Sequence, residues 1–125
     1  MKLRIKGNSL RLRVSRSELA TLIKSGAIEE TIHFAMEPNA KFTYALRHEP
    51  TATTVRIEYL PQQVAVLLST EDAERWAASD QVGIYGSSET SVGALEIVVE
   101  KDFACLDGNA LDDDAFPNPN AESVC

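Results

Sequence analysis

The sequence predicts an α+β fold built from two strand–strand–helix–strand–strand units, and three patterns carry that prediction. Seven short stretches alternate apolar and polar residues, as half-buried strands do, and an eighth is apolar throughout. Two stretches join a capping residue to an apolar stripe at helical spacing. A shift of 54 positions superimposes the apolar pattern of residues 1–25 on that of residues 55–79, which predicts a pseudo-twofold repeat. Because alternation repeats every two residues, any two hairpins can be aligned in this way. An accidental match is therefore the alternative to a true repeat.

The first unit begins with a hairpin and a helix. Residues 2–6 and 10–14 alternate apolar with basic side chains, which predicts two strands joined by a Gly-Asn-Ser turn. Ser15 followed by Glu18 forms a capping box, and an apolar stripe then continues to a stop at Gly26. This segment is therefore expected to be a short helix.

Two strands complete the first unit, and a second unit follows with the same order. Residues 29–34 and 42–46 alternate, and residues 48–53 contain a proline and connect the units. Residues 64–68 are apolar throughout, which predicts a strand buried on both faces, with its second face under a helix or a partner chain. The remaining elements are predicted as a strand at 55–59, a helix capped by Ser69 or Thr70, a strand at 82–85, a polar loop at 86–93 and a strand at 95–99.

We expect these elements to form one twisted antiparallel sheet or a small open barrel, with both helices packed on it. A chain of 125 residues with 44% apolar content supplies one core and is too short for two domains. The predicted domain covers residues 1–103, with units at about 1–47 and 55–102. Residues 104–125 form an acidic tail containing Pro and Asn, which lacks any period and is expected to be disordered or draped over the domain.

The net charge of −7 conceals an uneven distribution. Residues 1–25 hold seven Lys or Arg side chains against Glu18 alone, a net +6, which leaves −13 for the remainder. The basic N-terminal part and the acidic remainder of the chain attract one another, either within one molecule or between two. The overall acidity argues against nucleic acid as the principal partner.

The basic hairpin is the sharpest candidate for a site. Cations that share one strand face repel one another unless an anion neutralises their charge. This face is therefore expected to bind a phosphate, a nucleotide or an acidic protein segment. Pairing with the chain's own Glu96, Glu100 and acidic tail is the competing explanation. The candidate anion-binding residues are Lys2, Arg4, Lys6, Arg11, Arg13 and Lys101.

A catalytic alternative needs the same face to point inward. Small barrels that process triphosphates line a tunnel with Lys, Arg and Glu, so that Glu holds a metal and the cations hold phosphates. The partners in this chain would be Glu58, Glu96, Glu100 and Lys101. The first strand carries only cations, which disfavours this alternative.

The cysteines supply a third, separate hypothesis. Cys105 lies between carboxylates, which raise a thiol pKa and disfavour a nucleophile. A metal site made from Cys105, Asp107 and His33 is an alternative, although no paired-cysteine or His-x-x-x-His spacing supports it. A small apolar plug is the simpler interpretation of Cys105.

Four stretches together resemble a family of small bacterial proteins known only as a domain of unknown function. They are residues 1–13 (MKLRIKGNSLRLR), 80–84 (DQVGI), 100–106 (EKDFACL) and 116–119 (FPNP). The resemblance implies no activity and no catalytic residues. It implies that the hairpin and residues 100–106 are parts of one structural feature that the family shares. This favours a site or interface where the two segments meet.

These observations favour a non-enzymatic binding or interaction module that needs no cofactor. Its expected partner is an anionic small molecule or an acidic protein segment, and a homodimer in which one tail covers the other's basic face stays open. No apolar run has the length of about 18 residues that a membrane span needs, so we expect a cytoplasmic protein without membrane contact.

Overall fold

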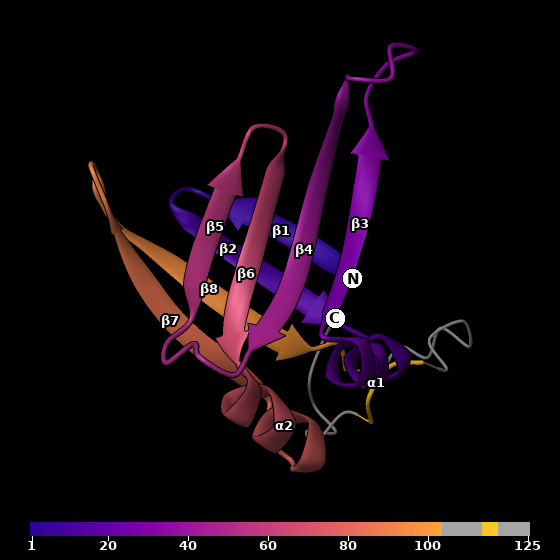
Figure 1. The fold of residues 1–125 in the computed structure, drawn as a ribbon, viewed down its shortest axis with the longest axis vertical. Helices are drawn as coiled ribbons and strands as arrows, with labels where there is room; N and C mark the ends of the chain where they lie inside the picture. Colours follow the sequence, from indigo (N-terminus) through magenta and orange to yellow (C-terminus); the bar gives the residue numbers. More distant parts are fainter. Residues whose placement is uncertain (104–113, 118–125) are drawn as a thin grey trace.

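Eight strands and two helices make up the described part of this computed structural model, residues 1–103 and 114–117 (Figure 1). The expected number and order of elements is confirmed. The elements are β1 (Lys2–Lys6), β2 (Ser9–Val14), α1 (Arg16–Ser25), β3 (Ala27–His33), β4 (Lys41–Glu49), β5 (Arg56–Leu60), β6 (Gln63–Ser69), α2 (Thr70–Ala78), β7 (Gly83–Thr90) and β8 (Gly93–Lys101).

The strands form two sheets, so the expected single sheet or open barrel is wrong. The first sheet has the order β1-β2-β8-β7 and the second has the order β3-β4-β6-β5. All four hairpins are antiparallel, but the central pairs β2–β8 and β4–β6 are parallel. Each sheet therefore joins a hairpin from the first half of the chain to one from the second half. Alternation within a strand reports which face is buried and not which strand lies beside it, so the sequence left this pairing open.

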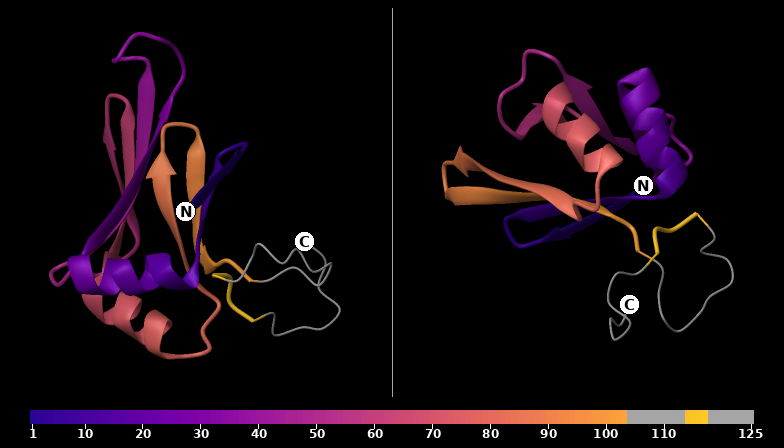
Figure 2. Two further views of the ribbon diagram at one scale, coloured as in Figure 1. Left: turned by 90° about the vertical axis from the view of Figure 1, so that its right-hand side faces the viewer. Right: turned by 90° about the horizontal axis from the view of Figure 1, so that it is seen from below.

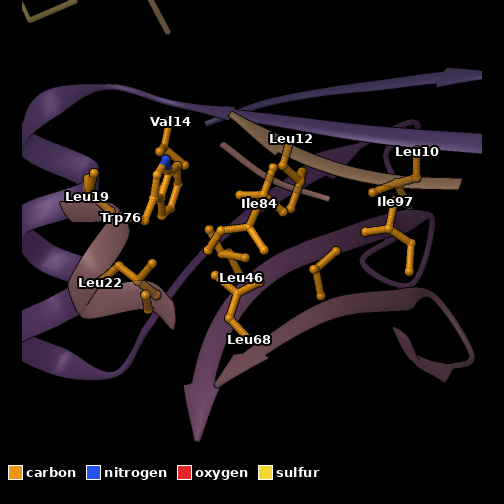
Figure 3. Packing of buried hydrophobic residues seen from close by; sticks show 13 residues of the cluster. Leu10, Leu12, Val14, Leu19, Leu22, Leu46, Leu68, Trp76, Ile84 and Ile97 are labelled. Carbon is orange, nitrogen blue, oxygen red and sulfur yellow. The ribbon is translucent and has the colours of Figure 1, made fainter. Parts of the chain in front are cut away.

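The apolar faces of the two sheets turn toward each other, and both helices lie at one end of the sheets (Figure 2). Trp76 of α2 is completely buried in the same cluster as Val14, Leu22 and Leu46 (Figure 3). Its indole Nε1 donates a hydrogen bond to the carbonyl oxygen of Val82 at 3.1 Å, which satisfies the one polar atom that this ring buries. Neither described helix is long and apolar enough to cross a membrane.

The expected helix caps are present. Ser15 and Glu18 complete the capping box of α1, and Gly26 ends the helix at φ 87°, a left-handed conformation that suits glycine. Ser69 caps α2 by accepting a hydrogen bond from the Asp72 amide at 3.0 Å. His48 then connects the two helices, because its Nε2 lies 3.0 Å from the carbonyl oxygen of Leu22 and its Nδ1 2.8 Å from the Thr70 hydroxyl.

The expected loop at 86–93 is a long hairpin instead. β7 continues to Thr90, and β8 begins at Gly93. Residues 87–90 carry polar side chains on both faces because this end of the hairpin extends past the apolar core, so the alternation that marks a strand disappears while the backbone pairing continues.

The apolar run in β6 is buried on both faces, as expected, but charged side chains of the neighbouring strands flank its outer side. Leu67 has no exposed surface although it lies on the outer face of the second sheet, in register with Arg47 and Arg56. Two ion pairs cross β6 here: Arg47 Nη2 to Glu58 Oε1 at 2.6 Å and Arg56 Nη2 to Glu49 Oε2 at 3.3 Å. We infer that the aliphatic stems of these arginines cover Leu67.

Residues 114–117, here called the docked segment, return to the fold at the start of α1 and the end of β8. The Phe116 amide donates to the carbonyl oxygen of Asp102 at 2.9 Å, and Phe116 forms a parallel bridge with Phe103. The Phe116 ring packs edge-on against Phe103 and lies below the Lys101 ammonium, 5.2 Å from the ring centroid. The tail expected over 104–125 is thus ordered at this point, and its other residues lie outside the described range.

Candidate anion-binding face

Five cations share the outer face of the first sheet, which is turned away from the second sheet. Along β1 and β2 the apolar side chains point inward, and the basic ones therefore point outward. The strand register places Lys2 beside Arg13 and Arg4 beside Arg11. We define the basic face as Lys2, Arg4, Lys6, Arg11 and Arg13.

Two of these cations form ion pairs with the chain's own carboxylates. Lys2 Nζ lies 2.8 Å from Asp102 Oδ2, and Arg11 Nε lies 3.3 Å from Glu100 Oε1. Among the described residues, no carboxylate lies within 4.0 Å of a charged nitrogen of Arg4, Lys6 or Arg13. Within residues 1–103 and 114–117, internal pairing therefore accounts for part of the basic face only, and most of the acidic tail lies outside these residues.

A hollow of about 230 Å³ opens on the basic face where β1, β2 and β8 lie side by side. The charged residues that line it are Arg4, Lys6, Arg11 and Glu96. The shorter side chains of Ser9 and Val98 also line it. Three cations around one hollow create a positive potential that favours an anion. The Ser9 hydroxyl donates to the carbonyl oxygen of Lys6 at 2.6 Å, so its proton is directed at a backbone acceptor.

Tyr85 of β7 extends this face and was not among the expected site residues. The register places Tyr85 beside Val98 and Val98 beside Arg11, on one side of the sheet. The Tyr85 hydroxyl donates to Glu100 Oε2 at 3.3 Å, and burial first and then the Glu100 charge raise the pKa of Tyr85. Alternation alone shows that Tyr85 points opposite to Ile84, but only the strand order places it near the cations.

Lys101 lies on the other face of the first sheet, away from the five basic residues. Its side chain is buried, and its Nζ donates to the carbonyl oxygen of Ser79 at 2.7 Å. Burial lowers the pKa of Lys101, while the nearby charge of Asp80 opposes that shift. Lys101 closes the end of α2 and contacts the docked segment, so it takes no part in the hollow.

A sequence profile described as "Family of unknown function (DUF7009)" matches residues 1–120. The chain belongs to this family. The match confirms the resemblance to an uncharacterised family, and it covers both sheets and the docked segment of this DUF7009 chain. No curated protein and no solved structure shows significant similarity to it.

The geometry of this DUF7009 member corrects the barrel hypothesis. The strands form two sheets and no closed barrel, and the cations point outward instead of into a tunnel. Glu58 lies on the second sheet in its ion pair with Arg47, apart from Glu96 and Glu100 on the first sheet.

Only one of the three proposed metal ligands lies in the part of the chain that the structure describes, so the metal site stays a prediction. His33 is exposed at the end of β3, and Cys105 and Asp107 lie outside the described residues. Residues 1–103 and 114–117 contain no group of three His, Cys, Asp or Glu side chains that are close enough to hold a metal ion.

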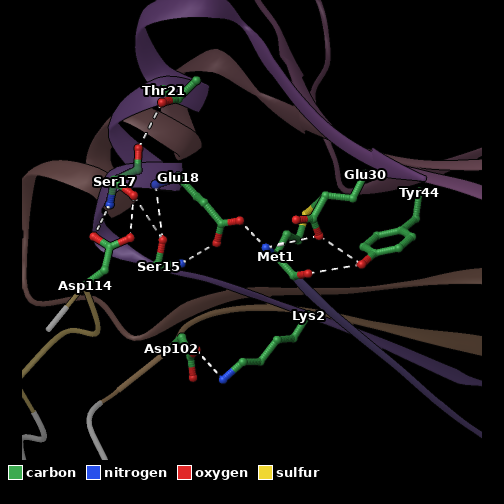
Figure 4. A network of polar contacts seen from close by, with 10 residues as sticks. All are labelled: Met1, Lys2, Ser15, Ser17, Glu18, Thr21, Glu30, Tyr44, Asp102 and Asp114. Carbon is green, nitrogen blue, oxygen red and sulfur yellow. Dashed lines mark hydrogen bonds and ion pairs between the residues drawn. The ribbon is translucent and has the colours of Figure 1, made fainter. Parts of the chain in front are cut away.

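A second polar cluster in this DUF7009 chain is already occupied by the chain's own cation (Figure 4). The amino group of Met1 contacts the Glu18 carboxylate and lies 3.2 Å from Glu30 Oε2, which the Tyr44 hydroxyl also contacts at 2.9 Å. Burial raises the pKa of Glu18, but hydrogen bonds from the Met1 amino group and from Ser15, together with the charge of that amino group, outweigh burial and lower it. This cluster connects β1 to α1 and β3, so we assign it a structural role.

Proposed function

We propose that this protein is a non-enzymatic binding module that holds a small anionic ligand in the hollow of its basic face. The observation that carries the proposal is the convergence of Arg4, Lys6 and Arg11 on one hollow in which only Arg11 has a carboxylate partner among the described residues. A bound anion relieves the repulsion among these cations and forms charge-assisted hydrogen bonds with them. An acidic protein segment is the alternative occupant, but the small volume of the hollow favours a small ligand.

The charge pattern also predicts how such binding responds to salt. All three cations lie at the solvent-exposed surface of the sheet, where dissolved ions screen their charge over about 8 Å at physiological ionic strength. Affinity for phosphate should therefore fall as sodium chloride is added at constant pH. Affinity that does not change with salt would contradict an electrostatic site.

Thermal unfolding with inorganic phosphate and pyrophosphate tests the proposal. A ligand that binds only the native state stabilises it by about 2.7 kcal/mol at 100 times its Kd, so the melting temperature of the wild type should rise. The double variant Arg4→Gln/Lys6→Gln removes two cations from the hollow and should lose most of that rise.

The matched control is Lys24→Gln/Lys41→Gln, which removes the same charge at two exposed positions, one on α1 and one on β4, outside the basic face. It should respond to pyrophosphate like the wild type. An equal loss in both double variants would indicate a nonspecific charge effect. No response in the wild type at any concentration would overturn the proposed function.

We also propose that the two halves of the chain are structural repeats, of which only the first carries a binding face. The strand orders support this, because β1-β2-β8-β7 becomes β5-β6-β4-β3 when each strand is replaced by its counterpart in the other half. The 54-residue shift then places Ala65 and Leu67 where the first sheet has Arg11 and Arg13. Superposition of residues 1–47 on 55–101 in an experimental structure tests the repeat, and mismatched helices would contradict it.

A further inference from the structure

We propose that the natural ligand class of the basic face is a nucleoside phosphate, with its phosphate in the hollow and its base stacked on Tyr85. This inference rests on the proposed function and specifies the ligand of the same site. It depends on a second observation, the exposed aromatic ring that lies on the same sheet face as the cations.

The distance across the sheet fits a nucleotide. Arg11, Val98 and Tyr85 occupy one row on three adjacent strands, β2, β8 and β7. Neighbouring strands lie about 4.8 Å apart, so the backbone of Tyr85 is about 10 Å from the strand that carries Arg11. Phosphate and base are the two ends of a nucleotide, and the sugar between them would lie over Val98. The small side chain of Val98 protrudes little from the sheet and leaves room for the sugar.

The Tyr85 ring is held in place before any ligand binds. Its hydroxyl donates to Glu100 Oε2, and the other carboxylate oxygen of Glu100 forms the ion pair with Arg11, so one carboxylate connects the ring to the hollow. Gly83 leaves room for this arrangement, because a Cβ at that position would lie 3.2 Å from the Tyr85 hydroxyl oxygen and 3.0 Å from Glu100 Cγ. The ring is nevertheless 58% exposed, so ring surface remains free for stacking.

Glu96 gives a reason for a sugar phosphate over a bare phosphate. A carboxylate in the lining of an anion hollow repels the ligand unless the ligand also brings hydroxyl donors. Ribose hydroxyls would donate to Glu96 while the phosphate contacts Arg4 and Lys6. The three parts of a nucleotide thus meet three different chemistries on one sheet face.

Titration with three probes at constant ionic strength separates these contributions. Inorganic phosphate, ribose 5-phosphate and adenosine 5′-monophosphate are added to the full chain, and backbone amide NMR shifts report both the affinity and the place of binding. Stacking of a base on an aromatic side chain should make the nucleotide bind on the order of tenfold more tightly than ribose 5-phosphate.

The variant Tyr85→Leu should reduce the affinity for the nucleotide to that for ribose 5-phosphate and leave the phosphate affinity unchanged. Tyr85→Phe keeps the ring and should retain most of the nucleotide preference. The control is Tyr59→Leu, because Tyr59 is similarly exposed at 72% but belongs to the second sheet. Melting temperatures of all variants verify that they are folded.

The outcomes distinguish this inference from the proposed function. Equal affinity for the nucleotide and ribose 5-phosphate, or a nucleotide preference that survives in Tyr85→Leu, overturns the nucleoside assignment. Phosphate binding that still depends on Arg4 and Lys6 would then leave the proposed function intact. If none of the three probes binds, both proposals fail.

Discussion

At the scale of single residues, Asp114 shows how one side chain fixes a segment that is remote in sequence. Its carboxylate accepts hydrogen bonds from the Ser17 hydroxyl and, at 3.0 Å, from the Ser17 amide in the first turn of α1. Its backbone oxygen also accepts from the Arg16 amide at 2.9 Å. A carboxylate at this position satisfies free amides of the helix and interacts favourably with the helix dipole.

The charge of Asp114 makes docking of residues 114–117 sensitive to acid. Hydrogen bonds from the Ser17 hydroxyl, followed by those from Ser15 and the Ser17 amide, lower its pKa below 3.8. A carboxyl group with a lower pKa in the docked state stabilises that state above 3.8 and loses this contribution as pH falls through the lowered value. NMR signals of the Phe116 ring should therefore shift toward undocked values in acid.

The variant Asp114→Asn is the comparison for this titration, because other carboxyl groups also titrate in acid. Its Phe116 signals should already be partly shifted at neutral pH and should change less on acidification. Identical titration curves for Phe116 in the variant and in the wild type would contradict the role of Asp114.

At the scale of elements, close contact between β7 and β8 depends on a glycine at position 83. Gly83 lies in register with Glu100, and a Cβ built there would be only 2.4 Å from the carbonyl oxygen of Val99. Backbone atoms of a paired strand move little, so this contact differs from a clash with a flexible side chain. The same glycine leaves the space that the Tyr85 hydroxyl occupies, which connects strand packing to the candidate site.

The variant Gly83→Ala should lower the free energy of unfolding by about 2 kcal/mol, because the added methyl group forces β7 away from β8. Chemical denaturation measures this change. Ser87→Ala is the control, since Ser87 lies on the same strand in register with Glu96 and already has a Cβ. Equal stability of Gly83→Ala and the wild type would show that the two strands separate without cost.

At the scale of the whole molecule, contacts between distant parts of the chain hold the two sheets and the helices together. Each sheet takes one hairpin from each half of the chain, so neither half completes a sheet by itself. His48 joins α1 to α2, and the Met1 amino group joins β1 to α1 and β3. The docked segment adds a further connection between β8 and α1.

Truncation tests what the docked segment contributes. A chain that ends after residue 113 lacks the Asp114 and Phe116 contacts, whereas a chain that ends after Pro117 keeps them. Loss of the half-buried Phe116 should cost about 2 kcal/mol, less than the 3–5 kcal/mol of a fully buried phenylalanine. The shorter chain should therefore melt several degrees below the longer one.

Phe116→Ala in the full chain separates the aromatic contact from the effect of chain length. It should reproduce most of the difference between the two truncated chains. If the chains that end at 113 and 117 melt at the same temperature, the docked segment does not stabilise the fold.

Local patterns in the sequence predicted most elements and the face of each strand. Ser15 with Glu18 and Ser69 predicted the helix starts because capping involves residues three positions apart. The pattern failed at residues 87–90, where the hairpin leaves the core and burial no longer sorts the side chains. Lys101 was also predicted to belong with the basic residues. Alternation contradicts this grouping, because Lys101 lies two positions after the buried Val99 and shares its inward face.

The sequence by itself determined that the described part of this protein has an apolar core, eight strands, two capped helices and a basic strand face, because each depends on residues within a few positions of one another. Only the tertiary structure decided that the strands form two sheets with parallel centres. It also decided that Glu100 connects Arg11 to Tyr85. These features depend on strand pairing across about 90 positions of the chain, between β2 and β8. Strands with the same alternation can pair with one another in several orders. The order that forms is the one that buries the apolar faces of all strands at once.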